Sequence, residues 1–240
     1  MSTLLLATAT EMEAGPLREE LEDETPLQLP YGSGSRGNFE GLDLTLLHHG
    51  VGKVNTAAGL ALAVDRLDPS GIIQFGIGGG HVGAFLSVGR VAIASCEIHT
   101  DTGARTASGW EDMESLGLPL LERERPWYNK FPTDPRLTAA ASEATGQPPV
   151  AFGTSETVTG TFDESRSLHD RFDVSVESME GAAAAQVCLA LNVPFAEIRG
   201  ISNIVGERAR HAWNIPGAVR AANAALIQAL RFLAREGSLC

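Results

Sequence analysis

The chain alternates apolar strand candidates with helical segments almost from end to end. The strand candidates are "TLLLATA" (3–9), "LDLTLLHHG" (42–50), "GIIQFG" (71–76), "VGRVAIASCEI" (88–98), "PVAFGTSETV" (149–158) and "VPFAEIRGIS" (193–202). Helical patterns occupy 12–21, 54–67, 180–191 and 217–235. This order predicts an α/β fold with a mostly parallel, twisted central sheet flanked by helices on both faces, as a three-layer sandwich. No boundary divides the chain, so we expect one domain over residues 1–240.

Composition narrows the class of partner. The formal net charge of -12 would repel a phosphate backbone, so nucleic-acid binding is disfavoured and a small-molecule partner is expected. The first residues, "MSTLLLATATEMEAG", have no basic segment and too short an apolar run for a signal peptide or membrane span. We therefore expect a cytoplasmic protein without membrane contact. Cys96, Cys188 and Cys240 fit neither a disulfide framework nor a zinc site, so we expect plain thiols.

Ligands of such sheets bind beyond the carboxyl ends of the strands, so the loops that follow strands are the places to search. The first strand runs into "TATEMEA", which puts Glu11 and Glu13 at a helix start, where acidic residues are also common for dipole reasons alone. The third ends in "FGIGGG" (75–80), predicted to be a turn. Its backbone, Ile77 and Gly78 included, can approach a ligand closely, although glycine-rich turns are frequent. No Arg, Lys or Ser stands there to hold a phosphate ion.

The stretch "VESMEGAAAAQV" (176–187) places Glu180 between an apolar strand end and a tightly packed helix. Burying an unpaired carboxylate costs several kcal/mol, so Glu180 needs a salt bridge, backbone N–H groups or a ligand with hydroxyls. A further strand end, "RGISNIVGER" (199–208), presents Ser202 and Asn203, which either cap a turn or face a ligand.

Five motifs, "ATATEMEA", "GVGKVNTA", "FGIGGG", "ESMEGAA" and "RGISNIVGER", occur in an order that resembles the nucleoside phosphorylase and nucleosidase superfamily. They cover the chain from near residue 4 to past 208, and within the superfamily the sequence is most similar to the futalosine hydrolases. The methylthioadenosine/S-adenosylhomocysteine nucleosidases carry the same glutamates but an aspartate at the position of Asn203.

The resemblance implies a role for each matched residue. Glu180, with the backbone of Met179, would hold the ribose 2′ and 3′ hydroxyls, and Glu13, rather than Glu11, would position and deprotonate the attacking water. Arg199 would either pair with Glu180 structurally or orient it behind the substrate.

The same resemblance implies contacts with the base. Asn203, next to Ser202, would read the purine. The loop "TVTGTF" (157–162) would lie along it, with Phe162 stacked on the ring or, alternatively, in the core. Hypoxanthine presents O6 and N7, both acceptors, and an asparagine amide supplies two donors, whereas a protonated aspartic acid suits adenine. The expected reaction is hydrolysis, because Glu13 and the uncharged glycine stretch would not hold inorganic phosphate.

These implications combine into one expectation: a nucleosidase that releases hypoxanthine from futalosine in menaquinone biosynthesis. No metal or organic cofactor is expected, since His99 and Asp101 lack a third ligand. The alternatives are an adenine-type nucleosidase of the methylthioadenosine class and a nucleoside-binding sensor without turnover. A homodimer or higher homo-oligomer is expected by analogy only.

The sequence does not choose between alternatives in two regions. The irregular segment at 100–135 is either a lid or dimer contact, or a surface insertion packed by its own aromatic residues. The 5′ side of futalosine carries an aromatic carboxylate, and the spacing does not choose among its possible partners Arg105, Lys130, Arg208 and Arg210.

Overall fold

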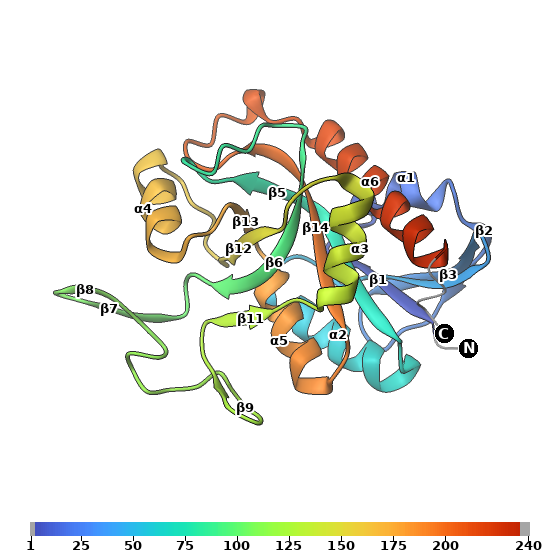
Figure 1. The fold of residues 1–240 in the computed structure, drawn as a ribbon, viewed down its shortest axis with the longest axis horizontal. Coiled ribbons are helices and arrows are strands. Elements are labelled where there is room, and N and C mark those ends of the chain that lie inside the picture. Colours follow the sequence, from blue (N-terminus) through green and yellow to red (C-terminus); the bar gives the residue numbers. More distant parts are fainter. Residues whose placement is uncertain (1–2, 236–240) are drawn as a thin grey trace.

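A computed structural model describes residues 3–235 of the chain. A ten-stranded central sheet has the order β11-β6-β12-β13-β5-β1-β4-β3-β2, with β14 paired to both β5 and β6 (Figure 1). Its strands are β1 (Leu4–Thr8), β2 (Glu22–Leu27), β3 (Ser33–Phe39), β4 (Leu42–His48), β5 (Gly71–Gly80), β6 (Val91–His99), β11 (Lys130–Pro132), β12 (Val150–Thr154), β13 (Val176–Ser178) and β14 (Phe195–Ile204).

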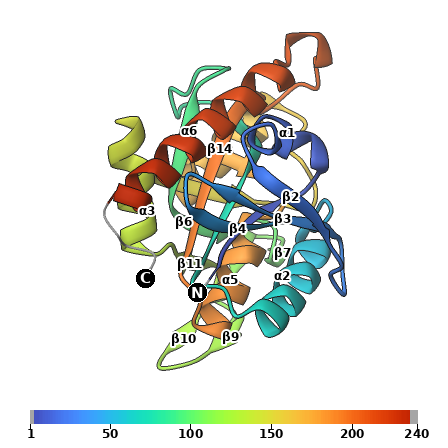
Figure 2. The ribbon, with the colours of Figure 1, turned by 90° about the vertical axis from the view of Figure 1, so that its right-hand side faces the viewer.

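Helices cover both faces of this sheet, which confirms the α/β class (Figures 1 and 2). One face packs α1 (Gly15–Arg18), α3 (Pro135–Thr145) and α6 (Ile215–Arg235); the other packs α2 (Lys53–Leu67) and α5 (Gly181–Leu191). Along β1, Leu4 and Leu6 join the first core, whereas Leu5 and Ala7 join the second. Alternate side chains point to opposite faces of a strand, so burial on both faces explains why this strand is continuously apolar.

The sheet is more mixed than the sequence predicts. β1 pairs in parallel with β4 and β5, and β14 with β5, but β13 runs antiparallel to β5, as does β14 to β6. The exposed hairpin of β2 and β3 was not expected, because its glycines, serines and glutamates do not form an apolar pattern. The first helix is also shorter than expected, consisting of a 3₁₀ turn η1 (Glu11–Ala14) followed by α1.

The prediction of a turn at "FGIGGG" is wrong, since β5 continues through Gly80. Its glycines pair with β14, and at Gly79 and Gly80 also with β13, so backbone hydrogen bonds keep the chain extended there. The missing side chains let neighbouring groups approach the strand: a Cβ atom at Gly76 would overlap an oxygen of Glu13 and lie 2.9 Å from Nη1 of Arg199. Gly76 therefore makes room for charged side chains, and the glycines after it make room for close neighbours such as Val176 and Val205, all within an extended strand.

Much of the segment at 100–135 is organised into short strands. β7 (Gly103–Thr106) and β8 (Gly109–Asp112) form a hairpin that projects from the body of the molecule (Figure 1), and β9 (Leu121–Glu122) pairs with β10 (Pro126–Trp127). The ring of Trp127 stacks on Phe131, and Trp110 meets Phe172 edge-on. Aromatic packing thus holds part of the segment, while its role as a lid or dimer contact stays a prediction.

Two remaining elements flank the strand ends, α4 (Phe162–Phe172) and the short 3₁₀ turn η2 (Arg210–Ala212). Cys96 and Cys188 are buried free thiols, and Cys240 lies outside the described residues. Among residues 3–235, no helix has the length and apolar character needed to cross a membrane.

Candidate active site

A cavity of about 230 Å³ opens where four of the sequence-predicted loops meet, at the carboxyl ends of β1, β5, β13 and β14. It is lined by Ala9, Thr10, Met12, Glu13, Val51, Ile77, Gly78, Gly79, Val158, Thr159, Glu177, Ser178, Met179, Glu180, Arg199, Ser202, Asn203, Val205, Gly206, Arg208 and Trp213. Eight of the nine residues predicted from the motifs are in this set, Phe162 being the exception. The fold therefore brings together side chains that are up to 190 positions apart in the sequence, from Glu13 to Asn203 (203 − 13 = 190).

Glu13 is buried on the 3₁₀ turn that follows β1, with 4% of its surface exposed. One carboxylate oxygen accepts hydrogen bonds from the N–H and the hydroxyl of Thr10, each at 2.9 Å, and the other accepts from the N–H of Ile77 at 3.0 Å. Burial raises the pKa of Glu13 above its ordinary value, although Arg199 and the Ile77 N–H pull it down. A carboxylate with a raised pKa is a better proton acceptor, which suits a general base.

Glu180 is the N-cap residue of α5 and equally buried. Its Oε1 accepts from the N–H of Gly52 at 3.0 Å, and its Oε2 accepts from the N–H of Met179 at 3.3 Å. Gly52 lies in the motif "GVGKVNTA". No residue of this motif was predicted to lie in the site. These backbone donors and one salt bridge stabilise the buried charge, so Glu180 does not require a ligand to be tolerated.

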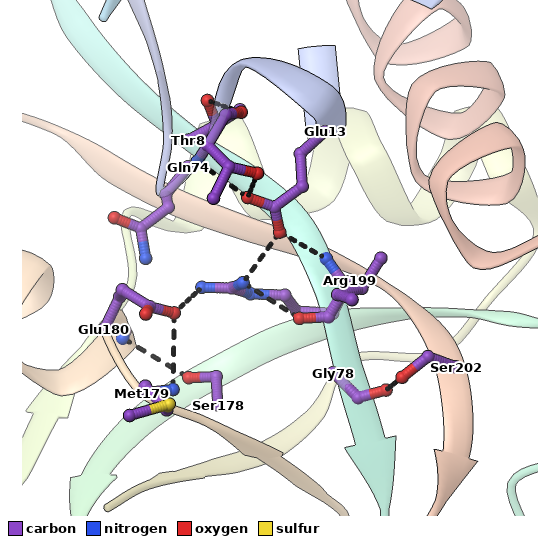
Figure 3. A network of polar contacts seen from close by, with 12 residues as sticks. Thr8, Glu13, Gln74, Gly78, Ser178, Met179, Glu180, Arg199 and Ser202 are labelled. Carbon is purple, nitrogen blue, oxygen red and sulfur yellow. Dashed lines mark hydrogen bonds and ion pairs between the residues drawn. The ribbon is translucent and has the colours of Figure 1, made fainter. Parts of the chain in front are cut away.

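Arg199 supplies that salt bridge and joins the two glutamates (Figure 3). Its Nη2 lies 3.1 Å from Glu180 and its Nη1 lies 3.9 Å from Glu13, with the guanidinium between the two carboxylates. Its Nε donates to Glu197 at 2.6 Å, and Nη1 also donates to the carbonyl of Ile77 at 3.0 Å. Burial alone would lower the pKa of Arg199, but Glu197, Glu180 and Glu13 together raise it, so the side chain is a permanent cation.

Ser202 and Asn203 close β14 at another wall of the cavity. The Ser202 hydroxyl lies 3.1 Å from the carbonyl oxygen of Gly78 and 2.7 Å from Oδ1 of Asn203. The amide nitrogen of Asn203 donates to the carbonyl of Ile204 at 3.1 Å. The Ser202 hydroxyl has one hydrogen for its two acceptors, and Oδ1 is the nearer one. When Oδ1 accepts it, the amide nitrogen is the part left to meet a ligand, with one hydrogen beyond that given to Ile204.

The loop at 157–162 contributes differently from the prediction. Val158 and Thr159 line the cavity, but Phe162 is the first residue of α4, 46% exposed, and its ring packs on Gly206 outside the lining. Its stacking role stays a prediction. Glu177 fixes the loop by accepting from the N–H and hydroxyl of Thr159, and its burial raises its pKa.

Thirteen of the lining residues were not among those predicted from the motifs, and four of them are informative. Glu177 lies inside the quoted stretch "VESMEGAA", and Val51 inside "GVGKVNTA", so both motifs carried a signal. Arg208 was one of four candidates for the 5′ end, and of the four it is the one that lines the cavity. Trp213, whose ring lies under the Arg208 guanidinium at 5.3 Å, has no sequence signal because it follows the last motif.

The pair His99 and Asp101 is occupied by protein groups. Nε2 of His99 lies 3.0 Å from Oε1 of Gln186, and Asp101 pairs with Lys53 at 2.7 Å. Over residues 3–235, no group of three or more His, Cys, Asp or Glu side chains is arranged to hold a metal ion.

Comparisons with known proteins identify the family of the chain. The profile described as "Phosphorylase superfamily" matches residues 3–235. A futalosine hydrolase of Thermus thermophilus is 34% identical over 97% of this chain and 96% of its own length. A 5′-methylthioadenosine/S-adenosylhomocysteine nucleosidase of Bacillus velezensis is 32% identical over 85% of this chain and 87% of its own.

Among solved structures, a methylthioadenosine/S-adenosylhomocysteine nucleosidase of Colwellia psychrerythraea, in complex with adenine, superposes with a TM-score of 0.83. The match covers 97% of this chain and 96% of that one at 24% identity. This likeness establishes the shared fold.

Proposed function

Since this chain belongs to the phosphorylase superfamily, and within it to the purine nucleosidases, we propose that it hydrolyses futalosine and releases hypoxanthine. The observation that carries the proposal is one cavity lined by Glu13, Glu180 and Asn203, with Arg199 joining the two carboxylates. The arrangement supplies a base, a negative charge and a hydrogen-bond donor around one small volume.

Glu180 acts on the ribose. An ionised carboxylate forms strong, charge-assisted hydrogen bonds, and Glu180 accepts those of the 2′ and 3′ hydroxyls beside its bonds to Gly52 and Arg199. As the N-glycosidic bond breaks, the sugar becomes an oxocarbenium-like cation, and a fixed negative charge next to it favours the transition state over the ground state.

Glu13 takes a proton from the attacking water. Water is the nucleophile rather than phosphate, because every nitrogen of the Arg199 guanidinium already contacts a carboxylate. Nε contacts Glu197, Nη2 contacts Glu180 and Nη1 contacts Glu13. An inorganic phosphate ion beside Arg199 would meet the two carboxylates of Glu13 and Glu180, and a guanidinium that is already paired. Hydrolysis follows from that charge distribution.

Asn203 selects the base. Its amide N–H₂ group donates to both acceptors of a 6-oxopurine, O6 and N7, once the hydrogen bond to the carbonyl of Ile204 is exchanged for the purine, whereas adenine presents a donor at N6 that would face a donor here. Ser202 supports this orientation by occupying the amide oxygen. An amide cannot act as an acid, so a hydrogen bond stabilises N7 and the leaving base takes its proton from solvent.

The proposal is tested by incubating the protein with futalosine, with and without phosphate, and separating the products by chromatography. We expect free hypoxanthine at the same rate in both reactions, and much slower base release from methylthioadenosine. Inosine, which has the same base without the 5′ extension, is the control for recognition of the base alone.

Each alternative gives a different result in this assay. Turnover that requires phosphate would make the protein a phosphorylase. Faster release of adenine from methylthioadenosine would place it with the relatives of the adenine type, and tight binding of futalosine without any free base would make it a nucleoside sensor.

The 5′ end of the nucleoside is assigned to Arg208 and Trp213, the cation and the aromatic ring that line the cavity. An aromatic carboxylate needs an apolar surface for its ring and a positive charge for its oxygens, and this pair provides both. Of the other candidates, Arg105 lies on the projecting hairpin, Lys130 on β11, and Arg210 on η2 outside the lining.

Replacing Arg208 with glutamine is expected to raise KM for futalosine about tenfold, the effect of losing one exposed charge-assisted hydrogen bond. KM for inosine, which has no 5′ carboxylate, should not change. Steady-state kinetics with both substrates measures the difference, and Arg210→Gln, two residues away and outside the lining, is the matched control. An equal loss on both substrates would refute the assignment of Arg208.

A further inference from the structure

A second pair of glutamates lies behind the proposed site, on the side of Arg199 away from the cavity. Glu97 on β6 and Glu197 on β14 are both completely buried, and neither lines the cavity. Neither was singled out in the sequence, because each occupies a strand position where the neighbours are apolar. Two buried carboxyl groups at one place need an explanation, since each ionised carboxylate costs several kcal/mol to bury.

Their carboxyl groups meet at one point, since a Cβ atom at Gly181 would overlap Oε2 of both Glu97 and Glu197. Two ionised carboxylates this close in a buried place repel each other, so one of the two is expected to hold a proton that both can share. Glu197 has the stronger donors: Nε of Arg199 at 2.6 Å on Oε1 and Nε2 of Gln74 at 3.2 Å on Oε2. Glu97 has only the Thr154 hydroxyl at 3.3 Å on Oε2, and its Oε1 has no donor. The geometry therefore makes Glu97 the acid and Glu197 the carboxylate.

The start of α5 is built around this pair. A Cβ atom at Gly181 would overlap carboxyl oxygens of both Glu97 and Glu197, so only glycine leaves room for them at this position. The N–H of Ala182 donates to Oγ1 of Thr154, and this leaves the Thr154 hydroxyl hydrogen free for Glu97. Gly181 directly follows Glu180, so the pair lies beneath the residue proposed to hold the ribose.

Charge balance supports the same protonation state. Arg199 is the cation that faces Glu13, Glu180 and Glu197, and Glu97 would add a fourth negative charge. Burial, reinforced by Glu197, raises the pKa of Glu97 well above its ordinary value; Arg199 opposes this effect, and Cys96 is the other titratable neighbour. With Glu97 neutral, the pair carries one negative charge.

The single negative charge of the Glu97–Glu197 pair determines how much of the positive charge of Arg199 is left to stabilise ionised Glu13. Arg199 lies 2.6 Å from Glu197 but 3.9 Å from Glu13, so Glu197 neutralises most of the charge that would otherwise stabilise ionised Glu13. We propose that Glu97 and Glu197 share one proton and act through Arg199 as positioning residues that keep Glu13 basic. The catalytic part of this statement rests on the proposed function, in which Glu13 is the general base.

The test compares wild type with Glu97→Gln, Glu197→Gln and the double variant. Glu97→Gln keeps a donor for Glu197 and a pair charge of one, so the acid limb of the kcat/KM profile should not move. In the double variant the pair carries no charge. Arg199 then stabilises ionised Glu13 more strongly, and the pair no longer repels it, so the acid limb should shift down by about one pH unit. Glu197→Gln leaves Glu97 able to ionise in its place, so we expect a smaller shift in the same direction.

Two outcomes overturn the proposal. A shift in Glu97→Gln alone would mean that both carboxyls are ionised in the wild type, and an unmoved limb in the double variant would mean that the pair does not influence Glu13. Ser165→Ala, which removes a completely buried hydroxyl outside the lining, is the control for a general loss of packing.

Two readouts do not depend on turnover. Infrared spectra of the wild type at neutral pH should contain the carbonyl band of a buried carboxylic acid that Glu97→Gln lacks, and the absence of this band would also refute the shared proton. The band of Glu13, identified as the one lost in Glu13→Gln, can be titrated in each variant. A protein that releases no hypoxanthine would thus contradict the proposed function while still testing the coupling between the pair and Glu13.

The pH dependence of the free energy of unfolding tests the protonation of Glu97 independently of turnover. Folded Glu97 keeps its proton to higher pH than the unfolded chain, so unfolding releases a proton and stability falls as pH rises from the ordinary glutamate pKa through the raised one. Glu97→Gln removes this loss. Its thermal midpoint relative to wild type should therefore increase with pH, and a difference that is constant with pH would contradict a protonated Glu97.

Discussion

Glu13→Gln is expected to lower kcat for futalosine hydrolysis by about a hundredfold to ten-thousandfold, with little change in KM. Glutamine retains the size of the side chain and an oxygen for the Ile77 N–H, but an amide cannot accept the proton of the attacking water. The ribose and base contacts are made by other residues, so substrate still binds. Single-turnover release of hypoxanthine, with binding measured separately by calorimetry, distinguishes the two effects.

The pH profile of the same variant carries a second expectation. The base acts when deprotonated, and burial raises the pKa of Glu13, so wild-type activity should fall at a pH above the ordinary glutamate value of about 4.3 as the solution is acidified. Glu13→Gln should lose that limb. Glu11→Gln is the matched control, since Glu11 is exposed and bonds only to Ser33 among the described contacts. Wild-type rates in Glu13→Gln would remove Glu13 as the base.

How far the sequence predicts the fold depends on how each element is buried. β1, α2, α5 and α6 were predicted because their apolar residues are covered on one or both faces, which leaves a visible pattern. The hairpin of β2 and β3 lies largely at the surface and has no such pattern. β5 was ended too early, because the glycines that usually signal a turn admit close neighbours to an extended strand here, Glu13 and Arg199 at Gly76 among them.

Residues of the candidate site could be named from the sequence where they follow strands in recognisable motifs, as Glu13, Glu180 and Asn203 do, and the three line one cavity. What the sequence left open for Glu180 was the choice between a salt bridge, backbone donors and a ligand, and the structure shows the first two together. Glu97 and Glu197 could not be found in this way. Their significance arises from a contact between two different strands and from Gly181, and no local pattern reports a contact of that kind.

Asn203→Asp should change which base the protein releases. We expect kcat/KM for futalosine to fall by about a hundredfold to a thousandfold, below the roughly ten-thousandfold of fully buried sites because Asn203 is only partly buried. An ionised aspartate repels O6 and N7 of hypoxanthine and offers them no donor, while a protonated one donates to N7 and accepts from N6 of adenine. The same variant should release adenine from methylthioadenosine faster than the wild type does.

The measurement is a competition assay in which futalosine and methylthioadenosine are present together and both free bases are quantified. Asn38→Asp, near the end of β3, makes the same chemical change outside the cavity lining and should leave the ratio of products unaltered. Ser202 keeps a hydroxyl next to residue 203 in the variant, so the side chain is held where the amide was and only its hydrogen-bonding character changes. A variant that loses both activities equally would show that Asn203 supports the fold of the strand end; one that keeps its preference for hypoxanthine would show that the purine is read by another group.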